Sequence, residues 1–278
     1  MKPNLPACWI AIALCLGLLS GCGAGTTAAS APAAAGQDAL SLVAGNDDAD
    51  ADAPDATESS APPPARGRRQ ARRHEQSVNC RRQKCIALTF DDGPGADTAR
   101  LLRMLHRRHV AATFFVLGQQ VRAHPELVAR AARQGHEIGI HTWDHRNLTT
   151  LSPRRMRAEL AGTVREVART TGVRPTLLRP PYGASNQRVL RTARKLGLAQ
   201  VLWSLDTFDW RTLAVRPTVR AVRQGARPGR IILMHDIHRT SVDAVPRVVR
   251  LLRRQGYHLV TVSQLLGHPR PGNTYSQR

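Results

Sequence analysis

Two adjacent carboxylates, Asp91 and Asp92, follow a short apolar run. Residues 89–94 read Thr-Phe-Asp-Asp-Gly-Pro, so a strand that ends here would pass directly into a tight turn. Two carboxylates that lie this close repel each other unless a cation or a proton separates them. The pattern therefore fits one metal ligand beside one general base, and a turn that uses aspartate as a cap is the alternative.

A pair of histidines, His141 and His145, follows a second apolar run. Histidines four residues apart share one face of a helical turn, where both can bind one metal ion. With one carboxylate from the Asp91-Asp92 pair, they would make a site of two histidines and one aspartate. Three protein ligands leave a coordination position open for water, which is typical of catalytic metal sites. Non-haem iron enzymes use the same ligand set, so these residues alone do not fix the metal.

Three further polar segments each follow an apolar run. Residues 179–183 read Arg-Pro-Pro-Tyr-Gly, residues 206–210 read Asp-Thr-Phe-Asp-Trp, and residues 233–238 read Leu-Met-His-Asp-Ile-His. Taken singly, each segment is equally compatible with a turn, a helix cap or a solvated loop.

The elements that must position these residues alternate along the chain. Amphipathic stretches separate seven apolar runs that we expect to be strands: 86–90, 112–117, 136–141, 176–179, 200–205, 230–235 and 258–261. Strands that alternate with helices predict a parallel sheet covered by helices. We expect an α/β barrel of about seven parallel strands, because functional residues follow strand after strand. An open doubly wound sheet would gather them at one switch point.

Taken in order, the five segments resemble the NodB-homology family of polysaccharide deacetylases, carbohydrate esterase family 4, over about residues 84–267. The fold of that family is a distorted (β/α) barrel, which agrees with the seven runs. The resemblance implies that Asp92, His141 and His145 are the metal ligands. It also implies that Asp91 is the general base and that Arg179 pairs with it.

The resemblance implies further roles around the same site. His235 would be the general acid and Asp209 the carboxylate that tunes it, although the division of roles between Asp206 and Asp209 stays open. Tyr182 would offer its backbone N–H to the oxyanion, and its ring would line the substrate groove.

Two more residues would then shape the pocket. Trp210 would line it, and Leu233 would pack near the acetyl methyl group.

The expected activity is metal-dependent hydrolysis of N-acetyl groups from N-acetylglucosamine residues of a cell-envelope or chitin-like polysaccharide, with peptidoglycan as first choice. The alternatives are O-deacetylation of acetylated xylan and a carbohydrate-binding homologue without catalysis. We expect a divalent metal, zinc, as cofactor, and a monomer that binds an acetylated polysaccharide. A serine esterase is disfavoured because the sequence contains no Gly-x-Ser-x-Gly segment.

The N-terminus is typical of an exported lipoprotein. Lys2 precedes the apolar run Ala7–Leu19, which has the length of a signal segment and ends in Leu-Ser-Gly-Cys. We expect residues 1–21 to be a lipoprotein signal peptide and Cys22 to be lipidated, with an ordinary signal peptide as the alternative. The protein would then be held on a membrane of the cell envelope, and on the outer membrane facing the periplasm in a cell with two membranes.

Residues 22–79 are rich in Ala, Pro, Ser, Thr, Gly and Asp and lack apolar periodicity, so we expect a disordered, flexible linker. The deacetylase-like domain would span residues 80–270, with a tail at 271–278. Cys80 and Cys85 form an even pair in an oxidising compartment once Cys22 is lipidated, and a disulfide between them is one expectation.

The formal net charge of +21 comes almost entirely from arginine and favours anionic partners. Nucleic acid is not expected among them, because the chain carries no recognition-helix or aromatic–basic motif.

Overall fold

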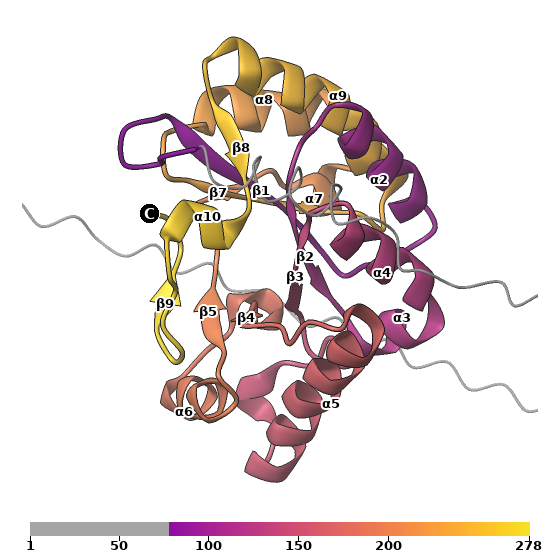
Figure 1. Cartoon of the computed structure of the whole chain (residues 1–278), viewed down its shortest axis with the longest axis vertical. Coiled ribbons are helices and arrows are strands. Elements are labelled where there is room, and N and C mark those ends of the chain that lie inside the picture. Colours follow the sequence, from indigo (N-terminus) through magenta and orange to yellow (C-terminus); the bar gives the residue numbers. More distant parts are fainter. Residues whose placement is uncertain (1–77) are drawn as a thin grey trace, which may run out of the picture. The chain divides into compact units, whose positions relative to one another are not determined.

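The computed structural model describes residues 78–278, and these form a barrel of parallel strands surrounded by helices (Figure 1). The predicted signal peptide, Cys22 and nearly all of the predicted linker lie outside the described residues. The strands are β1 (Cys85–Asp91), β2 (Thr113–Val116), β3 (Glu137–Ile140), β4 (Leu177–Leu178), β5 (Ala199–Val201), β6 (Leu205–Asp206), β7 (Ile231–His235), β8 (His258–Val260) and β9 (Thr274–Tyr275).

Helices fill most of the connections between these strands. They are α2 (Thr98–Arg107), α3 (Gly118–Ala123), α4 (Pro125–Arg133), α5 (Pro153–Thr171), α6 (Gln187–Lys195), α7 (Asp209–Thr212), α8 (Val215–Gly225), α9 (Arg239–Arg254) and α10 (Val262–Leu266). Two short 3₁₀ turns, η1 (Leu148–Thr150) and η2 (Pro181–Gly183), lie in the loops after β3 and β4. Among the described residues, no helix is long and apolar enough to cross a membrane.

The strand order is β6-β7-β1-β2-β3-β4-β5-β9, and β8 pairs with the first half of β1. β5 and β6 stand toward opposite ends of this order, yet only Leu202, Trp203 and Ser204 separate them. One continuous segment therefore pairs with β4 through β5 and with β7 through β6, which closes the ring. The expected strand at 200–205 is broken in the middle for this reason, and the predicted distorted barrel is confirmed.

Side chains of β1 alternate between the inside and the outside of the barrel. Ile86, Leu88 and Phe90 belong to the core between strands and helices, whereas Cys85 and Ala87 belong to a second core inside the ring. A strand of period two therefore carries Thr89 and Asp91 inward as well. The functional residue Asp91 thus stands above a packed interior rather than at the mouth of an open pore.

The end of the barrel at which the strands begin is closed by C-terminal residues. Val262 and Leu265 of α10 join the inner core beneath β1. β9 pairs with β5, and Gln277 forms an antiparallel bridge with Arg230. Residues 271–278, expected as a tail, are therefore part of the barrel, and its wall continues beyond residue 270.

Cys80 and Cys85 are joined in a disulfide at the same end of the barrel. The bond ties the turn at residues 79–83 to the first residue of β1, whose side chain is buried in the inner core.

Candidate active site

Three side chains meet at the end of the barrel at which the strands finish. Oδ1 of Asp92 lies 3.4 Å from Nε2 of His141 and 3.4 Å from Nε2 of His145. One ligand atom from each of these three residues lies within 4.8 Å of the other two. The sequence placed these residues in two distant segments, and the pairing of β1, β2 and β3 brings them together.

Backbone conformation, rather than a helical turn, brings the two histidines together. The chain after β3 is a loop in which Thr142 and His145 have φ values of 71° and 66°. Asp92 also lies in the left-handed region, at φ 73°. Non-glycine residues occupy this region at a cost, so three such residues at one site indicate a backbone held for the placement of side chains.

The three residues fit a divalent cation. Oδ1 of Asp92 is buried and has no hydrogen-bond partner, although it faces two histidine nitrogens. Nδ1 of His141 lies 2.6 Å from the carbonyl oxygen of Arg179, which accepts its proton and leaves the Nε2 lone pair directed at Asp92. Burial lowers the pKa of His141 to about 3, so the ring is neutral and able to bind a metal.

Asp91 lies beside this cluster and is bound by a buried arginine. Nη1 of Arg179 donates to Oδ1 of Asp91 over 2.7 Å, while Oδ2 of Asp91 is 3.9 Å from Nε2 of His141. Burial raises the pKa of Asp91, and the charges of Arg179 and His235 lower it in part. A carboxylate with a raised pKa, ionised beside a cation, is suited to accept a proton.

Arg179 itself is held on every side. It is fully buried, and Nη1 also donates to Oγ1 of Thr89 over 2.7 Å. Its Nε and Nη2 donate to the carbonyl oxygens of Val201 and Leu202, at the break between β5 and β6. Its guanidinium stacks over the ring of Phe115 at 4.1 Å. The guanidinium therefore presents one fixed direction to Asp91.

Sequence reasoning assigned no role to Thr89 or Phe115. Thr89 precedes Asp91 by two residues, and strand alternation alone places both on the same face. Phe115 gave no comparable signal, because an aromatic residue in a buried strand is ordinary core.

His235, at the end of β7, forms two hydrogen bonds with one carboxylate. Its Nδ1 lies 2.9 Å from Oδ1 of Asp209, and its backbone N–H donates to Oδ2 over 2.8 Å. Burial disfavours the charged imidazolium and so lowers the pKa of His235. The hydrogen bond and the negative charge of Asp209 raise it by more, and the pKa of His235 is about 9. The strand register sets His235 beside Asp91.

The structure separates Asp206 from Asp209. Oδ1 of Asp206 accepts from the backbone N–H of Phe208 over 2.7 Å and so closes a local turn. Asp209 begins α7, directly after Phe208 at φ 52°, and is buried against His235. Of the two, Asp209 is the partner of the histidine.

Tyr182 and Trp210 are exposed at this end of the barrel. Tyr182 is 69% exposed, has φ 61°, and places its ring edge-on to the His145 ring at 4.8 Å. Trp210 lies in α7 and is 46% exposed. Leu233 is buried in β7, paired with Thr89 one layer below Asp91 and His235.

Asp236 joins the site loops without reaching the cluster of ligands. Its Oδ2 accepts from Oγ1 of Thr98, and Thr98 in turn accepts from the backbone N–H of Gly95 over 2.7 Å. A Cβ atom at Gly93 would lie only 2.2 Å from Oδ1 of Asp236, so this position requires glycine. Asp236 thereby ties the loop after β7 to the loop that carries Asp92.

Two further histidines, His136 and His238, lie apart from this chemistry. His136 is buried at the start of β3 and accepts from the backbone N–H of Ala112 through Nδ1, so it is structural. The ring of His238 is 6.2 Å from that of His235.

Comparison with known proteins places the chain in one family. Residues 78–201 match the family model named Polysaccharide deacetylase. The chain is 43% identical over 185 residues to the peptidoglycan-N-acetylglucosamine deacetylase PgdA of Listeria monocytogenes, and this match covers 66% of the chain but only 39% of the relative. A peptidoglycan-N-acetylglucosamine deacetylase of Bacillus cereus is 36% identical over 190 residues, which cover 66% of this chain and 89% of that protein.

The likeness extends to solved structures. The structure of the T48 deacetylase with substrate superposes with a TM-score of 0.69 at 45% identity, over 72% of this chain and 100% of that one.

Proposed function

Because the chain belongs to the polysaccharide deacetylase family, we propose that it hydrolyses the N-acetyl groups of N-acetylglucosamine residues in a polysaccharide and releases acetate. Peptidoglycan is the first candidate, since both relatives described above are peptidoglycan deacetylases by name. The observation that carries the proposal is the meeting of Asp92, His141 and His145, with Asp91 and His235 beside them.

Asp91 and His235 divide the proton transfers of this reaction. Asp91 accepts a proton from water as the water oxygen bonds to the acetamide carbon. The carbon–nitrogen bond then breaks, and the departing nitrogen takes a proton from His235. An amine leaves poorly as an anion, so an acid held protonated by Asp209 serves this second step.

A divalent ion held by Asp92, His141 and His145 would supply Lewis-acid polarisation of the acetamide carbonyl and of water. We propose zinc as that ion, because one carboxylate oxygen and two imidazole nitrogens make a typical catalytic zinc set. Arg179 keeps Asp91 ionised and oriented. The backbone N–H of Tyr182 is proposed to donate to the oxyanion, while its exposed ring and Trp210 border the sugar.

Two other functions are weaker. O-deacetylation of acetylated xylan uses the same residues, but it is not the activity named for the two relatives. A binding protein without catalysis would have no use for a carboxylate–histidine pair such as Asp209 and His235, with its two hydrogen bonds.

A panel of acetylated glycans tests the proposal. Metal-loaded protein is incubated with peptidoglycan, with a soluble N-acetylglucosamine oligomer and with acetylated xylan, and released acetate is measured. We expect acetate and free amines from the first two substrates. Acetate from xylan alone would replace the proposed activity with O-deacetylation, and acetate from none would leave carbohydrate binding without hydrolysis.

We also propose that the protein is exported and anchored through lipid on Cys22, acting as a monomer at the cell envelope. Support comes from the segment Leu-Ser-Gly-Cys at residues 19–22 after the apolar run. Mass spectrometry of the mature N-terminus tests it. A diacylated Cys22 is expected, and a mature chain that retains residues before Cys22 or begins after it would contradict it.

A further inference from the structure

Aspartate is confined to one end of the barrel. The base is defined here as the end at which the parallel strands begin and the covering helices finish, and the site end is the opposite one. Within residues 78–278, every aspartate lies between the last residue of a strand and the second turn of the following helix, hence at the site end. Asp91, Asp92 and Asp209 are active-site residues, and Asp97 and Asp243 pair with Arg100.

The base, in contrast, is almost purely cationic. Every connection from a helix to the next strand contains an arginine or directly follows an arginine or lysine at the end of the helix, and within the described residues the one acid that borders these connections is Glu137, the first residue of β3. Glu137 is already occupied by hydrogen bonds from Thr113 and Ser263. Exposed cations in these connections, or next to them at a helix or strand end, are Lys84, Arg107, Arg133, Arg174, Lys195 and Arg227.

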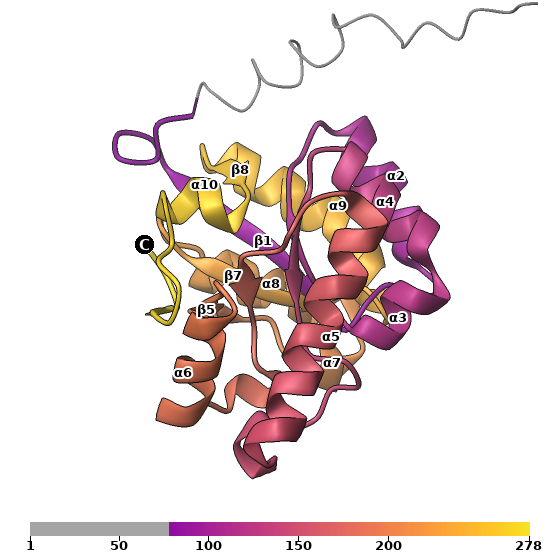
Figure 2. The same ribbon diagram turned by 60° about the horizontal axis from the view of Figure 1, so that its bottom comes forward.

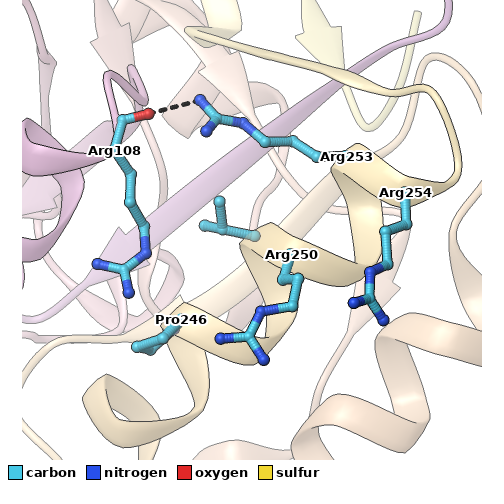
Figure 3. A pocket seen from close by; sticks show the side chains of 6 residues that line it. Arg108, Pro246, Arg250, Arg253 and Arg254 are labelled. Atoms are coloured by element: carbon cyan, nitrogen blue, oxygen red, sulfur yellow. Dashed lines mark hydrogen bonds between the residues drawn. The ribbon is translucent and has the colours of Figure 1, made fainter.

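A hollow of about 400 Å³ lies on this end, between the second half of α9 and the residue that follows α2. Its lining is Arg108, Arg250, Arg253 and Arg254, together with Pro246 and Val249 (Figure 3). Arg253 turns back and donates to the carbonyl oxygens of Arg108 and His109, so it holds α9 against α2. Arg250 and Arg254 extend from α9 one turn apart.

Within the described residues, none of the four arginines that line the hollow forms an ion pair. Of these, Arg250 and Arg254 also form no side-chain hydrogen bond there, and the same holds for Arg107, which precedes Arg108 in the chain. The one acid of α9, Asp243, lies at its other end and is bound to Arg100. Guanidinium groups that are left free around a concave surface match phosphate, which they bind through paired N–H donors.

We propose that the base of the barrel docks on an anionic phospholipid membrane, with lipid phosphate groups received in the arginine hollow between α2 and α9. The cations are spread around one whole end of the barrel. They therefore complement an extended anionic surface better than they complement a single narrow polyanionic chain. The chain also enters the barrel at this end, since residues 78–84 lead directly into β1 (Figure 2). Docking on the base leaves the site end turned away from the membrane, toward polysaccharide.

Vesicle binding tests this proposal without reference to catalysis. The full chain carrying Cys22→Ser, which no lipid can modify, is sedimented with vesicles of phosphatidylcholine alone or of phosphatidylcholine mixed with phosphatidylglycerol. We expect binding to the mixed vesicles to be stronger and to weaken as salt is added. Equal binding to both kinds of vesicle would overturn the proposal.

The hollow and its edge are tested with Arg250→Gln and Arg254→Gln, which line it, combined with Arg107→Gln beside it, and the triple variant should weaken binding to the mixed vesicles about a hundredfold. The matched control combines Arg154→Gln, Arg155→Gln and Arg157→Gln, which remove the same charge from exposed positions at the start of α5, on the site end.

The control should bind nearly as the parent does, and both variants should keep the parent's melting temperature and its acetate release from a soluble oligomer. Equal losses in the two variants, or none in the first, would contradict a docking face at the base. Tighter binding to soluble polyphosphate than to vesicles would make an anionic polymer the partner instead.

Discussion

Asp209 binds His235 through both of its carboxylate oxygens, one to the ring Nδ1 at 2.9 Å and one to the backbone N–H at 2.8 Å. The first bond fixes the protonation of the ring, and the second fixes the position of the residue at the end of β7. A histidine held in this way stays charged well above neutral pH, with a pKa of about 9. In the proposed reaction, this pair supplies the acid that the amine leaving group requires.

Asp209→Asn should therefore shift the pH dependence of turnover. His235 acts in its protonated form, which is present below its pKa, so activity is lost as pH rises through that value. Loss of the carboxylate lowers the pKa of His235, and the alkaline limb of the kcat profile should move to lower pH, with kcat reduced about a hundredfold. Asp206→Asn is the matched control, since its carboxylate accepts from the N–H of Phe208 and forms no hydrogen bond with His235. An unmoved alkaline limb in Asp209→Asn would contradict the assigned pair.

Arg179→Met should shift the acidic limb of the pH dependence of turnover. Asp91 accepts a proton only when ionised, above its pKa, and Arg179 lowers that pKa against the effect of burial. Without the cation the pKa of Asp91 rises further, so the acidic limb should move to higher pH. Arg179→Lys, which keeps the charge, should leave the limb closer to that of the parent. Breaking the buried pair should also cost about 3 kcal/mol of stability, measured by denaturant unfolding. If the acidic limbs of the parent, Arg179→Met and Arg179→Lys were identical, Arg179 would not control the pKa of Asp91.

Tyr182→Ala should separate the backbone role from the ring role. The proposed donor to the oxyanion is the N–H, which the substitution retains, whereas the exposed ring beside His145 is removed. We expect KM for a soluble oligomer to rise several-fold while kcat changes by less than about threefold. A large fall in kcat with unchanged KM would show that the ring acts in the chemical step.

The disulfide at the base should matter for stability and not for turnover. Cys80 and Cys85 close a short loop at the end of the barrel opposite the active site. Cys80→Ser with Cys85→Ser should lower the free energy of unfolding by about 2 kcal/mol, the loop-closure value for so short a loop. Acetate release by the folded protein should be unchanged, and a loss of turnover below the melting transition would show coupling between the two ends.

Much of the fold was predictable because apolar runs and helix signals are local. The segments 86–90, 112–117 and 230–235 became β1, β2 and β7 with small changes at their ends. Serine before proline is a typical local signal for the start of a helix, and α5 begins in this way: Ser152 is its N-cap, with the hydroxyl accepting from the N–H of Arg155, and Pro153 is its first residue.

Local sequence patterns could not predict how the barrel closes. The break between β5 and β6, and the pairing of β9, depend on contacts between segments distant in sequence.

The site was predictable to the same extent. The order of the five segments pointed to the residues that meet, but the sequence placed His141 and His145 on a helical turn that does not exist. The left-handed backbone conformation of Thr142 and His145 brings the two histidines together instead. Threonine and histidine rarely adopt this conformation, so the sequence does not predict it. The anchoring of Arg179 by the carbonyls of Val201 and Leu202 was likewise invisible, since it arises where the barrel closes.

In the proposed reaction, acetate release depends on one metal ion held by Asp92, His141 and His145. The most direct measurement is a zinc titration of metal-stripped protein in which bound ion and acetate release from an N-acetylglucosamine oligomer are followed together. We predict that activity is absent without metal, rises in proportion to bound zinc and reaches its plateau at one ion per chain. Asp92→Ala should bind zinc at least about tenfold more weakly. It should stay inactive when one zinc ion per chain is added. Full activity in the stripped protein, or wild-type activity in Asp92→Ala, would show that acetate release does not require a metal ion at this site.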